Sequence, residues 1–151
     1  MQELYEIEQI KQLKARYFRG IDTCNLELLR GILAQDVLIR FDSPTYQLEI
    51  NGMSEAMDFY GTSFTNRRFG MHNGHTPEIS VKGDEATGLW YLHDIFINLD
   101  EGTILHGSAI YEDRYTKVDG QWRILRTGYK RLLEMIQPLD SQCNITSRPI
   151  N

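Results

Sequence analysis

Three polar side chains far apart in the sequence, Tyr17, Asp22 and His72, are of the types that proton-transfer chemistry requires. An imidazole can act as a general base, and a carboxylate can hold that imidazole in one orientation. A phenol can donate a hydrogen bond to a developing oxyanion. If the fold brings these groups together, they can move protons with no cofactor and no metal ion. We therefore expect neither in the site.

Each of these residues also has an ordinary structural explanation. Tyr17 follows the helical period and could pack in the core, Asp22 could cap a turn, and His72 could lie at a strand end. Tyr17 and Asp22 are five residues apart, so on a regular helix their directions differ by about 140°. They share a face only if the helix ends between them, and the residues from Asp22 to Asn25 are typical of such an end.

The direction of His72 depends on the regularity of its strand. Strict alternation places His72 on the face opposite Ile79 and Val81, away from the apolar interior. A β-bulge near Gly74 would reverse this parity. A catalytic His72 therefore predicts a bulge there.

Asp94 lies inside an apolar run and shares its strand face with Trp90 and Phe96. Because burying an unpaired carboxylate is expensive, Asp94 needs a partner or a raised pKa. Arg131, late in the last predicted strand, could pair with it or bind an anionic or carbonyl group. The alternatives are an edge-strand aspartate and a solvated arginine.

A metal site is the main competing interpretation, because His72, His75, His93 and Asp94 offer enough ligands for one. Two histidines three residues apart on a strand face opposite sides, however, and Cys24 and Cys143 have no metal-binding or redox spacing. We expect both cysteines to be reduced. The sequence also holds no nucleophile elbow, phosphate loop or dinucleotide fingerprint.

The hydrophobic pattern predicts helices first and then long strands. The helices cover about residues 3–22, a segment capped by Asn25 that runs to Leu33, and a segment from Ser54 to Phe64. The strands cover 37–41, 46–50, 71–81, 86–99, 103–118 and 121–135, with an irregular tail over about 137–151. This order indicates one α+β domain over residues 1–151, a cone-shaped α+β barrel. Three helices pack on a strongly curved, mixed but largely antiparallel sheet that encloses a pocket.

The composition limits the classes of molecule with which the protein is expected to interact. A formal net charge of -5 and the lack of a basic run argue against nucleic acid. No apolar stretch is long enough for a membrane span, and the acidic start is unlike a secretory signal. The eight Tyr, six Phe and two Trp residues favour a lined cavity. We expect a cytoplasmic protein that acts on a small hydrophobic molecule.

Four segments, residues 10–22, 72–79, 86–92 and 119–124, resemble the SnoaL-like branch of the nuclear transport factor 2-like superfamily. The similarity covers nearly the whole chain in order and is closest to the bile acid 7α-dehydratases. Scytalone dehydratase and hexachlorocyclohexane dehydrochlorinase are more distant. The chain departs from the dehydratases in a shorter loop before Ala86 and at His93, where they carry an acidic residue.

The resemblance implies roles for particular residues. Asp22 and His72 match the family's orienting aspartate and catalytic base, and Tyr17, Asp94 and Arg131 match further active-site residues of the dehydratases. We expect the substrate to contact Trp90, Phe96, Tyr129 and His106. The resemblance also implies a homotrimer.

The resulting hypothesis is a cofactor-free dehydratase that removes water from a steroid-like or polycyclic hydroxy-ketone. Whether the substrate is a coenzyme A thioester is left open. One alternative is an isomerase or polyketide cyclase, with Asp94 as a protonated oxyanion donor. Another is a non-catalytic small-molecule-binding protein, in which Asp22 and His72 would lie too far apart to hydrogen-bond or the cavity would be closed.

Overall fold

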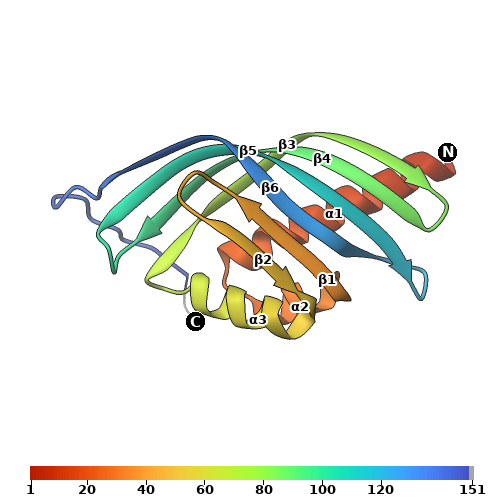
Figure 1. The fold of residues 1–151 in the computed structure, drawn as a ribbon, viewed down its shortest axis with the longest axis horizontal. Coiled ribbons are helices and arrows are strands. Elements are labelled where there is room, and N and C mark those ends of the chain that lie inside the picture. The colour runs from red at the N-terminus through yellow and green to blue at the C-terminus, as the bar shows by residue number, and fades with distance from the viewer. Residues whose placement is uncertain (150–151) are drawn as a thin grey trace.

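The computed structural model describes residues 1–149 and begins with the predicted long helix, α1 (Gln2–Asp22). One stripe of α1 is buried, because apolar residues recur every three or four positions and face the concave side of the sheet. The sheet arches over this helix (Figure 1). We expected Tyr17 and Asp22 to share a face only if the helix ended between them. The helix does not end there, since α1 continues through Asp22.

The two short helices differ in how well their starts were predicted. α2 (Leu26–Ile32) is capped by Asn25, whose side chain accepts a hydrogen bond from the backbone N–H of Leu28 at 2.9 Å. α3 (Gly52–Ser63) begins two residues before Ser54, so Ser54 is not its cap. The carboxylate of Glu55 instead accepts from the N–H of Asn51 at 2.8 Å and ties the helix to the preceding strand.

Six strands form one sheet in the order β2-β1-β6-β5-β4-β3. Their bounds are β1 (Leu33–Asp42), β2 (Gln47–Asn51), β3 (Arg68–Lys82), β4 (Glu85–Asn98), β5 (Thr103–Val118) and β6 (Gln121–Pro138). All neighbours are antiparallel except β1 and β6, which run parallel. The predicted α+β class and mixed, largely antiparallel sheet are confirmed.

Several strands are longer than their sequence patterns indicated. β3 starts at Arg68 rather than at residue 71, and β6 continues to Pro138, where an irregular segment was expected from residue 137. The end of β6 is held by pairing of Pro138 with Thr103, a contact that local sequence cannot reveal. Among residues 1–149, no helix combines the length and apolarity needed to cross a membrane.

The bulge predicted near Gly74 is present and sets the direction of the site residues. The register of β3 against β4 shifts between His75 and Glu78, and Thr76 adopts a φ of 49°. On one side of this bulge His72 faces the concave interior, and on the other side Ile79 and Val81 do so. The same strand therefore supplies both core residues and an interior imidazole.

Candidate active site

His72 and Asp22 form a hydrogen-bonded pair at the junction of β3 with the end of α1. Asp22 Oδ1 lies 2.6 Å from His72 Nδ1, and the backbone N–H of His72 donates to both carboxylate oxygens at 3.2 and 3.1 Å. The His72 side chain is 8% exposed. Because Nδ1 faces the carboxylate, the neutral imidazole would carry its proton on Nδ1 and keep a free lone pair on Nε2. That arrangement suits a general base.

Aromatic rings hold the imidazole in place. Phe18 stacks on His72 at 6.2 Å between ring centroids, and Phe64 meets it edge-on at 5.7 Å. A Cβ at position 74 would lie 2.1 Å from the Phe18 ring, so only glycine allows this packing. Gly74 therefore lies next to the bulge and also leaves the space that the Phe18 ring occupies.

Tyr17 lies behind the cavity wall rather than on it. Its side chain is fully buried, and its hydroxyl hydrogen-bonds the hydroxyl of Tyr60 at 2.8 Å. Burial raises the pKa of Tyr17 to about 12. Tyr60 and Tyr111 line the cavity, while Tyr17 does not. Of the two hydrogen-bonded phenols, Tyr60 and not Tyr17 reaches the cavity wall, and sequence reasoning missed Tyr60.

Asp94 has the partner that its apolar surroundings demanded. Arg131 donates to both of its carboxylate oxygens, at 2.5 and 2.8 Å, and both side chains are nearly buried. Glu134 lies 3.4 Å from Arg131 Nε and also accepts from Ser43 at 2.8 Å. Position 107 must be glycine here, since a Cβ would lie 2.4 Å from Arg131 Nη1.

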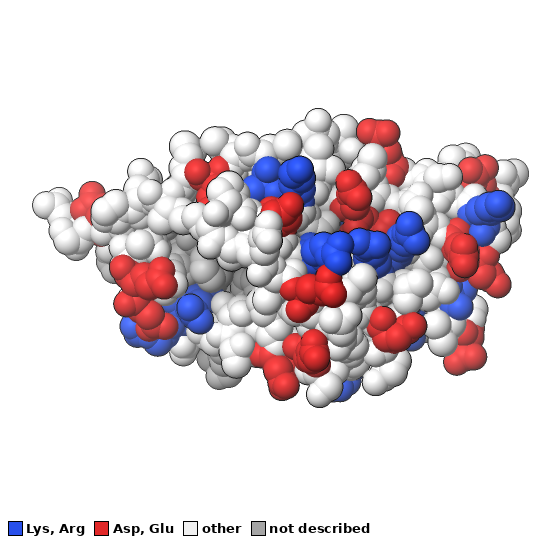
Figure 2. All heavy atoms as spheres, viewed as in Figure 1, with Lys and Arg blue, Asp and Glu red and all other residues white. Residues whose placement is uncertain are grey.

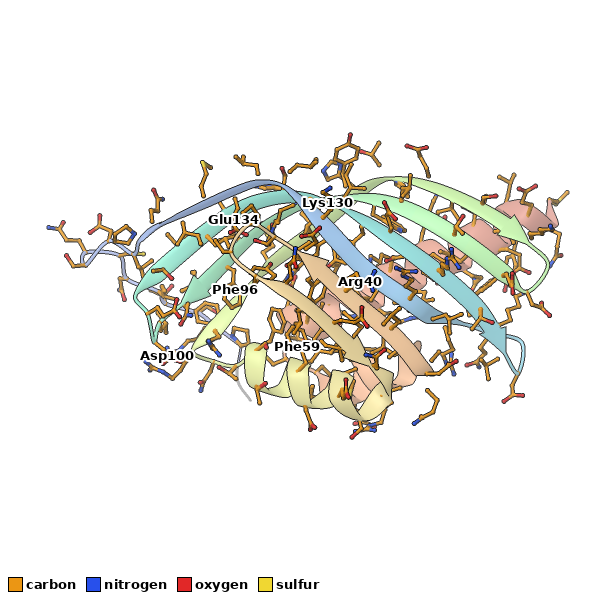
Figure 3. All side chains as sticks on the ribbon, viewed as in Figure 1. Arg40, Phe59, Phe96, Asp100, Lys130 and Glu134 are labelled. Carbon is orange, nitrogen blue, oxygen red and sulfur yellow. The ribbon has the colours of Figure 1, made fainter. Side chains whose placement is uncertain are left out.

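His72 of the first pair and both residues of the second, Asp94 and Arg131, line one cavity of about 560 Å³ under the concave side of the sheet. Its wall is largely aromatic and aliphatic, and includes Phe59 of α3 and Phe96 of β4, both labelled in Figure 3. Tyr46 and Tyr129 also line it and share a hydrogen bond between their hydroxyls. A mostly apolar cavity with a few convergent polar groups is the usual form of a small-molecule site.

Of the four expected substrate contacts, Phe96 and Tyr129 line the cavity, while Trp90 and His106 do not. Trp90 is buried in the hydrophobic core outside the cavity, where its indole N–H donates to the hydroxyl of Tyr115 at 3.0 Å. His106 pairs in register with Ile95 and lies on the opposite, convex face of the sheet. His106 is therefore outside the site because its side chain points to the other face of the sheet. Trp90 is outside the site because it lies further along its strand.

A buried ion pair behind the tyrosines was also missed. Lys14 Nζ lies 2.7 Å from Asp113 Oδ2, with both side chains 0% exposed, and 3.7 Å from the Tyr111 ring centroid. Asp113 also accepts hydrogen bonds from Thr127 and Tyr115, each at 2.7 Å. Burial lowers the pKa of Lys14, and the charge of Asp113 opposes that shift.

Sequence signals for this pair existed. Lys14 is three residues before Tyr17, on the buried stripe of the helix, and Asp113 alternates with Tyr111 and Tyr115 on one strand face. A lysine and an aspartate each placed on an apolar face indicate mutual neutralisation, because neither can be buried alone.

Comparison with known proteins shows the same family that the sequence resembles. The sequence profile of the SnoaL-like domain matches residues 2–128. A Mycobacterium tuberculosis protein of unknown function is 28% identical, with a TM-score of 0.73 over 85% of this chain and 72% of that chain.

Two solved structures with enzyme names share the fold. Hexachlorocyclohexane dehydrochlorinase LinA-type3 of Novosphingobium barchaimii has a TM-score of 0.79 at 17% identity, over 95% of this chain and 97% of its own. A scytalone dehydratase candidate from Novosphingobium aromaticivorans has a TM-score of 0.72 at 20% identity, over 97% and 93%. At these identities the likeness concerns the fold.

Proposed function

Because the chain belongs to the SnoaL-like domain family, we propose that it is a cofactor-free lyase of the dehydratase type. Its substrate is a bulky steroid-like or polycyclic hydroxy-ketone, as the resemblance to the bile acid 7α-dehydratases implies. The observation that carries the proposal is the hydrogen-bonded His72–Asp22 pair in the wall of a largely apolar cavity. Dehydrochlorinase and dehydratase names among structures of the same fold support elimination chemistry.

The reaction begins with proton abstraction by His72. Nε2 takes the proton from the carbon beside the substrate carbonyl, and Asp22 stabilises the imidazolium that forms. The electron pair of the C–H bond passes to the carbonyl and leaves an enolate. When the enolate collapses, a carbon–carbon double bond forms, the carbon–oxygen bond breaks, and the imidazolium proton joins the departing hydroxide as water.

The enolate oxygen needs a hydrogen-bond donor, and the proposed donor is Tyr60, which lines the cavity. If Tyr17 donates to the Tyr60 oxygen, the Tyr60 proton is free to point into the cavity. One such donor contributes on the order of 10²–10³ in rate. Tyr17 then acts through Tyr60 as a positioning residue.

Asp94 and Arg131 are proposed to hold the substrate's oxygen functions. Both Asp94 oxygens already accept from Arg131, which favours the imidazolium of His72 over Asp94 as the proton donor. The same ion pair disfavours an isomerase in which a protonated Asp94 completes the oxyanion hole. An isomerase or cyclase would nevertheless use the same base, and its product would keep the mass of the substrate. A purely binding protein was expected to have separated Asp22 and His72 or a closed cavity, and neither is observed.

The test is turnover of hydroxylated 3-oxo-steroids and polycyclic hydroxy-ketones, followed by mass spectrometry for loss of water. His72→Ala should lower the rate by about 10²–10⁴-fold, which is the usual contribution of a general base. His75→Ala is the matched control, because His75 is exposed and stacks on Tyr91, away from the cavity. Undiminished turnover by His72→Ala would sink the mechanism.

The homotrimer implied by the resemblance stays a prediction. Exposed apolar side chains support a covered sheet face, since Met71, Tyr91 and Met135 are 44%, 44% and 52% exposed. The particle mass from light scattering tests this, and a mass of one chain would contradict it.

A further inference from the structure

The floor of the cavity changes chemical character along its length. β3, β4 and β5 are paired in register, so lining residues form rows across the strands. The inner row, with His72 and Asp94, is polar. The middle and outer rows follow it toward the start of β3, which lies beside the end of β4. The middle row is apolar: Phe96, Leu105 and Ile136. The outer row is polar again: Arg68, Asn98 and Thr103.

Arg68, in the outer row, has no carboxylate partner among the residues that the structure describes. Arg131 is paired with Asp94, and the neighbouring Arg67 lies 2.5 Å from Asp100. Arg68 takes part in none of the ion pairs found among residues 1–149. Its Nε is shielded from water and has no hydrogen-bond partner in the described part of the chain. A shielded donor without an acceptor is costly, so an acceptor brought by a ligand would relieve that cost.

One acidic residue, Glu101, also lines this end of the cavity. It lies in the turn after β4 and is exposed, so water can solvate its carboxylate and it needs no partner. Figure 2 shows acidic and basic side chains together on the surface around this turn, which is located by the label of Asp100 in Figure 3. The Nε of Arg131 is shielded in the same way, but the guanidinium of Arg131 already binds Asp94 through its other two nitrogens. Among the described charged side chains that line the cavity, Arg68 is therefore the one with an unmet interaction.

We infer that the outer row is an anion subsite, in which Arg68 binds a carboxylate at the end of the substrate remote from the reacting carbon. Asn98 and Thr103 can add hydrogen bonds to the same group. This inference rests on the proposed function and specifies its substrate class as an amphipathic polycyclic acid. Arg68 and His72 are four residues apart on one strand, so their Cα atoms are separated by about 13 Å at about 3.3 Å per residue. A rigid polycyclic body fits between the polar ends, over the apolar middle row.

The experiment compares three ligands that differ only at the remote end. They are 3-oxoandrost-4-ene-17β-carboxylate, its carboxamide and the corresponding 17β-amine. Affinities are measured by calorimetry for the wild type, Arg68→Gln and Arg67→Gln. Arg67→Gln removes the same charge one residue away, from an arginine that does not line the cavity.

The wild type should bind the carboxylate about 10- to 100-fold more tightly than the carboxamide, as expected for charge-assisted hydrogen bonds. Arg68→Gln should abolish this preference, because carboxylate affinity falls by more than carboxamide affinity, while Arg67→Gln should retain it. Retention of the preference in Arg68→Gln, tighter binding of the amine, or no binding of any ligand by the wild type would each overturn the subsite.

The binding measurement requires no turnover, so it separates this inference from the proposed reaction. Binding with the expected preference but no dehydration of any hydroxy-steroid would contradict the dehydratase alone. Dehydration with equal rates for acid and amide substrates would leave the dehydratase standing and overturn the Arg68 subsite alone.

Discussion

Replacement of Lys14 by methionine tests how strongly the buried ion pair supports the cavity. Met has similar length and keeps the packing of the stem but removes the charge. Asp113 is then left fully buried with only the hydroxyls of Thr127 and Tyr115 as partners. Breaking one side of a buried pair costs about 3–5 kcal/mol, a large part of the roughly 5–15 kcal/mol that holds a domain folded. For a chain of this size, that corresponds to a fall in Tm of about 6–20 °C.

The assay is urea unfolding followed by tryptophan fluorescence, with the slope m compared between variants. Lys11→Met is the matched control, because Lys11 lies on the same helix and its pair with Glu8 is exposed. The double variant Lys14→Met/Asp113→Asn should be more stable than Lys14→Met, because Asn is neutral. Its side-chain oxygen can still accept from one of the two hydroxyls, and its NH2 group can donate to the oxygen of the other. If Lys14→Met were no more destabilising than Lys11→Met, the account of this buried pair would be refuted.

Two further predictions concern the site and its surroundings. Gly107→Ala places a Cβ 2.4 Å from Arg131 Nη1 and 2.9 Å from Asp94 Oδ1, so it should displace this pair and lower turnover by up to about 100-fold. Gly31→Ala is the control, and it should not lower turnover, because its Cβ meets nothing within 4 Å. Equal activity of the two variants would contradict the reasoning. The raised pKa of Tyr17, about 12 against 10.0 for a free phenol, means that the folded state keeps this proton where the unfolded state loses it. The stability linked to Tyr17 is therefore intact below pH 10 and is lost as pH rises from 10 to 12. Phenolate absorbance and circular dichroism recorded together check this, and full ionisation of all tyrosines near pH 10 in a still-folded chain would refute it.

Local patterns were sufficient for most of the architecture. The apolar stripe of α1, the Asn25 cap and the four long strands are each encoded within about twenty residues, because helices and strands have fixed side-chain periods. The start of α3 and the end of β6 were misplaced, because they depend on the Glu55 contact and on pairing with β5.

The sequence by itself determined the types of group available at the site: a base, carboxylates, phenols and arginines. It also showed that His72 could face inward only with a bulge, and that Asp94 needed a partner. Only the tertiary structure decided which groups meet. Asp22 reaches His72 across fifty positions, and Tyr60 rather than Tyr17 reaches the cavity. Within residues 1–149, the Nε of Arg68 has no hydrogen-bond partner. The physical reason is that residue periodicity assigns a side chain to a face, whereas strand register, helix placement and depth in the cavity assign its neighbours.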